Sequence, residues 1–187
     1  FPLFLAILFC SLGVAQETEN IYSIIDKVSS SRIEQDIKKL VSFGTRHTLS
    51  DTLSEFRGIG AARRWIKSEF DQISKNCNGC LEVFYQKNYF TPKDGDRIVK
   101  PVWINNVVAI QKGKTHPNRF IIMSGDIDSR ISDPTNYTDD SPGANDNASG
   151  MAGTLEAARV LSDYSFENSI LYVGLAGEEQ GLFGGKG

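Results

Sequence analysis

The chain has 187 residues and a formal net charge of −3 at pH 7. With 40% hydrophobic and 23% charged residues, its composition is that of an ordinary globular protein, and its length suits one domain with a real core. The slightly acidic balance excludes a broad basic surface, so no nucleic-acid partner is expected.

Residues 1–15 are predicted to be part of a signal peptide. FPLFLAILFCSLGVAQ is an apolar run that ends in small residues at Gly13 and Ala15, which suits cleavage before Gln16. The run is too short to span a membrane, so no stable membrane anchor is expected. The mature protein is therefore expected to be exported, either secreted to the extracellular space or periplasmic.

The middle of the chain alternates helical and extended patterns. Apolar residues at helical spacing, such as Ile33, Ile37 and Leu40, predict short helices over residues 18–43, and a polar loop follows. Further helices are expected at residues 59–73 and 151–162. Apolar and β-branched runs predict strands at residues 81–90, 104–110, 119–124 and 169–176.

Cys77 and Cys80 lie in the sequence KNCNGCLEV. In an exported protein this pair is expected to form a small local disulfide. A CxxC pair can also be half of a zinc site or a redox centre. No second CxxC and no nearby histidine supports zinc, and no aromatic or proline context supports a redox centre, so the disulfide is favoured.

The second half of the chain reads as strand, loop, helix and strand. Its strands are almost continuously apolar, which is typical of strands buried on both faces by helices. The predicted fold class is therefore α/β, a three-layer α/β/α sandwich with a mostly parallel mixed central sheet that is incomplete in this chain.

Acidic residues follow two of these predicted strands. Asp126 and Asp128 come after residues 119–124, and Glu178 and Glu179 come after residues 169–176. Ligands of open α/β sheets bind at the carboxyl ends of strands, so both pairs are expected at one edge. Clustered carboxylates need a counter-charge, and a divalent cation supplies one. Asp146, in the glycine-flanked GANDNASG before a helix, suits a carboxylate that bridges two metal ions.

The segments SGDIDSR, PGANDNASG, LEAARVL and AGEEQGLFGGKG resemble the zinc-dependent aminopeptidase family of two-zinc exopeptidases. That family includes bacterial leucyl aminopeptidases, aminopeptidase Y and plasma glutamate carboxypeptidase-like enzymes. SFGTRHT, GIGAARRWI and NNVVAI are similar to its N-terminal portion. The resemblance implies that residues 16–187 are the N-terminal part of a single metallopeptidase catalytic domain that uses two zinc ions and acts on a peptide or amino-acid derivative.

The resemblance also implies roles for individual residues. Asp146 matches the aspartate that bridges the two zinc ions, and Glu179 matches a ligand of one of them. Glu178 matches the general base that activates water. Asp128 matches a carboxylate that orients the first metal ligand. Asp126 stands where the family usually has a histidine ligand, and as a carboxylate it remains a candidate metal ligand.

Two departures from the family pattern matter. Asp126 in place of histidine hardens the site, which favours Mn or Mg more than an imidazole would. The family's remaining aspartate and histidine ligands are expected beyond Gly187, so the chain is expected to be a fragment that is inactive and aggregation-prone alone. Its two histidines, His47 and His116, are predicted to lie on the surface, His116 in a hairpin-like turn.

Three functions remain open at this stage. The first is an exopeptidase, in particular an aminopeptidase, in which Glu178 takes a proton from the attacking water. The second is a single-zinc acyltransferase like the glutaminyl cyclases that share this fold. The third is a non-catalytic family member that has lost its metal, for which Asp126 is the best support.

Overall fold

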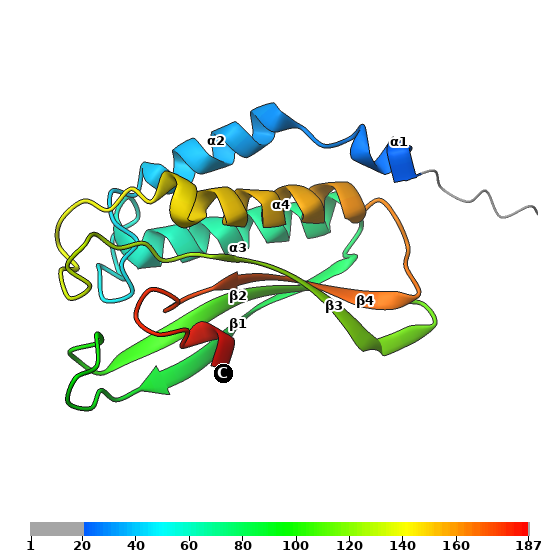
Figure 1. Ribbon diagram of the computed structural model, residues 1–187. Helices are drawn as coiled ribbons and strands as arrows, with labels where there is room; N and C mark the ends of the chain where they lie inside the picture. The colour runs from blue at the N-terminus through cyan, green and yellow to red at the C-terminus, as the bar shows by residue number, and fades with distance from the viewer. Residues whose placement is uncertain (1–20, 187) are drawn as a thin grey trace, which may run out of the picture.

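The computed structural model describes residues 21–186, and the predicted signal peptide at residues 1–15 lies outside this range. Figure 1 shows helices packed along one side of a twisted sheet. The elements in chain order are α1 (Ile21–Ile25), α2 (Ser30–Val41), α3 (Gly58–Asn76), β1 (Leu81–Phe90), β2 (Val102–Gln111), β3 (His116–Asp126), the short turn η1 (Ala144–Ala148), α4 (Ser149–Leu161), β4 (Asn168–Leu175) and the 3-10 turn η2 (Gly184–Lys186). None of the helices within residues 21–186 is long and apolar enough to cross a membrane.

The four strands form one mixed sheet in the order β1-β2-β4-β3. β1 pairs with β2 and β2 with β4 in antiparallel fashion, whereas β3 and β4 run parallel. The predicted α/β fold with a mixed sheet is thus confirmed, but the expectation of a mostly parallel sheet is wrong for residues 21–186, where two of the three strand pairings are antiparallel. β4 lies inside the sheet, and β1 and β3 are its two edges within the described residues.

The helices cover one face of this sheet (Figure 1). α3 packs on β1 and β2, α4 packs on β3 and β4, and α2 lies against α4. Helical spacing brings Ile59, Ile66 and Phe70 of α3 into the main core, where each is at most 3% exposed. A smaller core around Ile104 and Ala176 lies apart from this main cluster. No α-helix of residues 21–186 covers the opposite face, so this part of the chain supplies one of the two expected helical layers.

The expectation that every apolar strand is buried on both faces is wrong for β3. Phe120, Ile121 and Ile122 are 54%, 54% and 65% exposed. β3 is an edge strand in this sheet, and α4 covers only one of its faces. The expectation holds better for the inner strands, where Val107 and Tyr172 are fully buried.

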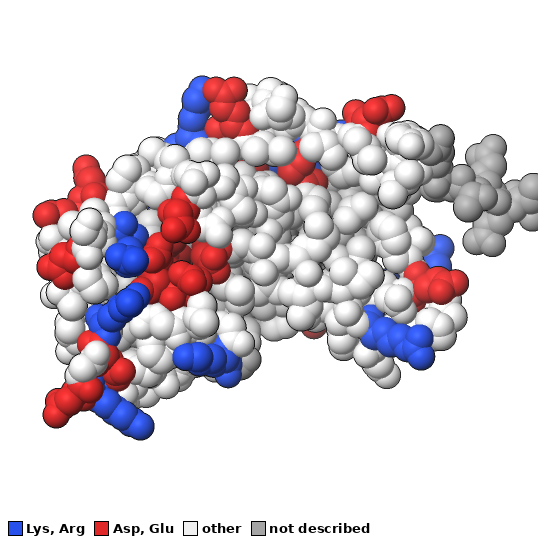
Figure 2. All heavy atoms as spheres, in the orientation of Figure 1, with Lys and Arg blue, Asp and Glu red and all other residues white. Residues whose placement is uncertain are grey.

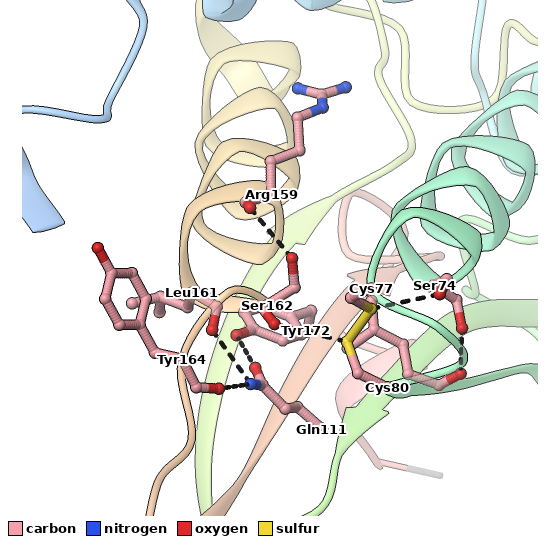
Figure 3. The surroundings of a disulfide bond; sticks show 10 residues. Ser74, Cys77, Cys80, Gln111, Arg159, Leu161, Ser162, Tyr164 and Tyr172 are labelled. Carbon is pink, nitrogen blue, oxygen red and sulfur yellow. Dashed lines mark hydrogen bonds between the residues drawn. A yellow bond between two sulfur atoms is a disulfide. The ribbon is translucent and has the colours of Figure 1, made fainter.

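The predicted disulfide between Cys77 and Cys80 is confirmed. It joins the end of α3 to the start of β1 (Figure 3). At the same end of the sheet, Gln111 accepts a hydrogen bond from the Tyr172 hydroxyl at 2.8 Å and donates to the Tyr164 carbonyl at 2.8 Å. These contacts fix the ends of α3 and α4 to the sheet at the end opposite Asp126.

Candidate metal-dependent active site

Carboxylates collect where β3 and β4 end. The parallel register pairs Asp126, the last residue of β3, with Leu175, the last residue of β4. Glu178 and Glu179 therefore emerge from β4 beside Asp126, because neighbouring parallel strands end at the same edge of the sheet. Figure 2 shows acidic side chains gathered with basic ones at this end of the molecule, while the rest of the visible face is mostly uncharged.

Asp146 comes to this edge in the turn η1, which links the acidic loop to α4. The turn is tight because Gly143 adopts a left-handed conformation (φ 47°), where a Cβ would meet Ser129. Asn147, which follows Asp146, donates a hydrogen bond from its side-chain amide to Asp126 Oδ2 at 2.9 Å. Asn147 thus joins the turn to the end of β3, with Asp146 exposed beside it.

The charges of these groups act on one another. Burial raises the pKa of Asp126, and the negative charge of Asp146 raises it further against the Asn147 hydrogen bond. Burial also raises the pKa of Glu178, with added contributions from the charges of Asp126, Glu179 and Asp146. A carboxylate with a raised pKa is a better proton acceptor near neutral pH. Glu178 therefore has the electrostatic environment of a general base.

Glu179 is held by an arginine. Arg130 Nε lies 2.6 Å from Glu179 Oε2 in an ion pair, and the Glu179 side chain is only 11% exposed. The Glu179 carbonyl accepts a second hydrogen bond from Arg97 at 2.9 Å. The orientation of Glu179 is thus fixed from both its side chain and its main chain.

Asp128 is fully buried beneath the segment that carries Glu178 and Glu179. Its two oxygens accept hydrogen bonds from the main-chain N–H groups of Glu178 at 3.2 Å and Glu179 at 3.1 Å, and from the Thr48 hydroxyl at 3.1 Å. Burial raises the pKa of Asp128 to about 7, and these hydrogen bonds oppose the rise. Asp128 therefore orients the segment that carries the candidate base and ligand.

His47 is fully buried, so the prediction that it lies on the surface is wrong. Its Nδ1 accepts a hydrogen bond from the Leu49 N–H at 3.0 Å. In a neutral imidazole the hydrogen must then be on Nε2, which donates to the Pro134 carbonyl at 2.9 Å. The loop after α2 folds inward, because its polar groups find partners there. His116 is exposed as predicted, but it begins β3 and lies in no hairpin turn, since β4 separates β2 from β3.

A chain of buried polar groups connects His47 to Asp128. The Thr48 hydroxyl has one hydrogen and lies near two oxygens, Asp128 Oδ2 at 3.1 Å and Gln180 Oε1 at 2.6 Å. On the other side of the same amide, Gln180 Nε2 lies 3.0 Å from His47 Nε2. A half-turn of the Gln180 amide removes the donor–donor contact: its nitrogen donates to Thr48, Thr48 donates to Asp128, and its oxygen shares the single Nε2 hydrogen of His47 with the Pro134 carbonyl. We therefore assign a directed hydrogen-bond chain from His47 through Gln180 and Thr48 to Asp128.

Arg46 is a further buried residue that sequence patterns did not reveal. Its guanidinium, 1% exposed, donates to the carbonyls of Ile127 at 2.8 Å, Leu40 at 3.1 Å, Pro142 at 2.7 Å and Gly143 at 2.9 Å. These carbonyls belong to the end of α2, the segment after β3 and the start of η1. Arg46 thus fixes the loop of Asp146 relative to the strand end of Asp126.

The donor set suits a divalent cation. Within residues 21–186, no three His, Cys, Asp or Glu side chains already converge as a complete ligand set. The candidate ligands Asp126, Asp146 and Glu179 are carboxylates whose repulsion, together with that of Glu178, contributes to the raised pKa values. A bound cation relieves such repulsion. The residues present therefore fit part of a metal site, and Asp128 is already occupied by its three donors.

Comparison with known proteins agrees with the motifs. Residues 106–187 match peptidase family M28. A probable zinc metalloprotease of Pyrenophora tritici-repentis is 42% identical over 168 residues, which cover 90% of this chain and 39% of that protein. A probable zinc metalloprotease of Pyrenophora teres f. teres is 46% identical over 166 residues, covering 89% and 34%. The chain therefore spans less than half the length of these relatives.

Solved structures share the fold. LapB from Legionella pneumophila superposes with a TM-score of 0.66 at 26% identity, over 89% of this chain and 40% of that one. The LapA aminopeptidase of the same organism gives a TM-score of 0.65 at 22% identity, over 90% and 40%. A glutaminyl cyclase of Porphyromonas gingivalis gives 0.63 at 20% identity, over 84% and 50%, so the fold alone does not select one reaction. The expected resemblance to zinc peptidases is confirmed: the chain is similar to probable zinc metalloproteases, and its residues 106–187 match peptidase family M28.

Proposed function

We propose that the whole protein is a metal-dependent exopeptidase, in particular an aminopeptidase, that hydrolyses a terminal peptide bond with an activated water. The observation that carries this proposal is that Asp126, Asp146, Glu178 and Glu179 lie at one edge of the sheet, where burial raises the pKa of Glu178 and the charges of the other three raise it further. An acidic loop that is only solvated would not require these four carboxylates to lie at the same edge of the sheet. The metalloprotease relatives and the aminopeptidase neighbours support the same reading.

Asp126, Asp146 and Glu179 would hold the metal, with Asp146 as the bridge between two zinc ions. Bound zinc supplies a Lewis acid that polarises the scissile carbonyl and makes an attacking water more acidic. Asp126 is a hard oxygen donor, so Mn or Mg can compete with zinc better here than at a histidine. Further ligands would come from parts of the protein outside this chain.

Glu178 would move the proton. Its carboxylate takes a proton from the attacking water as the water adds to the terminal peptide carbonyl. The same carboxyl group then gives that proton to the leaving amine as the carbon–nitrogen bond breaks. Burial and the neighbouring carboxylates raise its pKa above the ordinary value, which makes it a stronger proton acceptor than an exposed glutamate.

A substitution at Glu178 tests this proposal. Glu178→Gln keeps the shape of the side chain but cannot take a proton, so we expect the turnover of aminoacyl anilides by the whole protein to fall by about 10²–10⁴-fold. Glu82→Gln, an exposed residue on β1, makes the same charge change away from the site and should leave turnover unchanged. Full activity of Glu178→Gln would remove Glu178 as the base.

Elemental analysis of the same samples separates the alternatives. An exopeptidase of the proposed kind holds about two metal ions per chain, a glutaminyl cyclase-like acyltransferase about one, and a non-catalytic relative none. Metal content near zero in the purified whole protein would contradict the proposal even if some hydrolysis were seen.

We also propose that the protein is exported. The support is the Cys77–Cys80 disulfide, because disulfides persist in oxidising compartments. Secretion by the native host, followed by N-terminal sequencing of the secreted protein, tests this. A mature protein that begins near Gln16 is expected, and retention of the uncleaved chain in the cytosol would contradict it.

A further inference from the structure

A large cavity lies on the helical side of the sheet, away from the carboxylates described above. It has a volume of about 1030 Å³ and is bounded by the loop around Leu49–Leu53, by α3 and by the ends of β1 and β2. None of Asp126, Asp146, Glu178 or Glu179 lines it. We call it the basic cavity, because its lining contains the basic residues Arg57, Arg63, Lys87 and Lys100 but only one acidic residue, Asp51.

Three polar side chains of the basic cavity have no partner among the described residues. Arg63 is half-buried on α3, and no carboxylate or carbonyl accepts from its guanidinium. Lys87 and Asn105 face each other across the β1–β2 pairing, and neither side chain makes a hydrogen bond or ion pair. Asn105 Oδ1 is buried without a donor, and since an anion cannot supply one, only the Asn105 amide nitrogen is suited to contact an anion. By contrast, Arg57 is neutralised by Asp140 at 2.6 Å.

An unpaired, half-buried guanidinium is costly. Its N–H groups are partly withdrawn from water and gain no acceptor from the described residues, and burial lowers the pKa of Arg63. Asp51, the one acidic residue of the lining, uses its Oδ1 for the N–H groups of Leu53 at 2.6 Å and Ser54 at 3.0 Å and forms no ion pair with Arg63. The position calls for an external anion.

The neighbouring aromatic residues indicate an organic anion rather than a bare ion. Tyr89 and Trp103 lie with ring centroids 5.1 Å apart and remain 58% and 56% exposed at the cavity. Half-exposed aromatic faces beside cationic groups suit a ligand with an apolar body and a charged end. A carboxylate fits the planar fork of an arginine in bidentate fashion.

We propose that the basic cavity binds the carboxylate of a peptide or acylated amino acid, with Arg63 and Lys87 on the carboxylate, Asn105 donating through its amide, and Tyr89 and Trp103 against the apolar part. This site does not depend on the proposed hydrolysis, and it holds its ligand whether or not metal is present.

Binding to metal-free whole protein tests the proposal, with Trp103 fluorescence and calorimetry as readouts. The probes are N-acetylphenylalanine, its uncharged amide, and inorganic phosphate. We expect the acid to bind at least about tenfold more tightly than the amide, because only the acid offers charge-assisted hydrogen bonds to Arg63. Equal binding of acid and amide would overturn the proposal, and tighter binding of phosphate would overturn the assignment to a carboxylate.

Matched variants locate the site. Arg63→Gln should weaken binding of the acid by about tenfold or more, and Asn105→Asp should weaken it similarly by placing a negative charge against the ligand. Arg119→Gln makes the same charge change on the exposed face of β3 and should have no effect. An equal loss of acid binding in Arg119→Gln and Arg63→Gln would overturn the proposed site. Metal content should be unchanged in every variant, so failure of this proposal and failure of the peptidase proposal are distinguishable.

Discussion

Asp128 influences the candidate site through the main chain. Its side chain forms no hydrogen bond with Asp126 or Asp146, but it accepts from two consecutive N–H groups, those of Glu178 and Glu179. Asp128 is therefore a positioning residue, although the family pattern suggested that it would orient the first metal ligand. The Thr48 hydroxyl completes its set of donors and connects it to His47 and Gln180.

Thr48→Val tests this chain of hydrogen bonds. Valine fills the same space but cannot donate to Asp128, so the turn of Glu178 and Glu179 should lose its fixed orientation. We expect kcat and metal affinity each to fall by about 10–100-fold with little change in KM, as for other residues that orient metal ligands. Thr48→Ser restores the hydroxyl and should restore both quantities. A Thr48→Val protein with wild-type metal affinity would show that the chain does not orient the site.

His47 should make stability depend on pH. Burial lowers the pKa of His47 below its ordinary value of 6.5. Between these two pKa values the unfolded chain binds a proton that the folded chain does not, so the stability present above pH 6.5 is lost as pH falls through the folded pKa. Urea unfolding between pH 5 and pH 8 measures this. His47→Gln should remove this contribution and exposed His116→Gln should keep it, while Asp128, whose pKa burial raises to about 7, contributes with the opposite sign in both variants. A His47→Gln protein with the pH profile of the wild type would contradict the buried, neutral state of His47.

Among the connecting segments, the loop after α2 carries most of the organisation of the site. Thr45, Arg46, His47 and Thr48 are all at most 4% exposed, although the segment is polar and lies between two helices. Arg46 joins the end of α2, the segment after β3 and the start of η1 through four carbonyls. Loss of this arginine should therefore separate three elements at once.

Arg46→Lys measures that connection. An ammonium group cannot reach four carbonyls in the plane of a guanidinium, so several buried carbonyls lose their donor. We expect the free energy of unfolding to fall by about 3 kcal/mol or more, from the cost of leaving buried polar groups unsatisfied. Arg64→Lys, on the exposed side of α3, is the control and should cost much less. Equal losses in the two variants would show that Arg46 does not hold these elements together.

Local patterns predicted the elements better than their arrangement. The strand at residues 81–90 begins and ends as predicted, because its apolar run is bounded by a glycine-containing turn and a proline. The positions of Asp126, Asp146 and Glu179 in the sequence placed the candidate ligands at strand and helix ends. Strand order was not readable, because the insertion of β4 between β2 and β3 depends on contacts distant in sequence. Arg46, Thr48 and Gln180 were missed since buried and solvated polar loops look alike in a single sequence.

The whole molecule leaves a strand edge and an apolar sheet face open within residues 21–186. Ile122 on β3 is 65% exposed, beside Phe120 and Ile121. Exposed apolar edge strands promote association. We expect residues 21–186 produced alone to self-associate in sedimentation experiments, and Ile122→Lys to reduce this. Phe56→Lys, at an 80% exposed position off the sheet, should not. A monomeric, active form of residues 21–186 would contradict this expectation.

The Cys77–Cys80 disulfide lies at the end of the strands opposite Asp126. Opening it by a reductant would loosen the corner between α3 and β1 without touching the candidate ligands. If dithiothreitol inhibits the protein and a phosphine reductant does not, the inhibition would therefore indicate that the thiols of dithiothreitol remove a bound zinc ion. In an assay buffer, these two reagents separate loss of the metal from loss of the bridge.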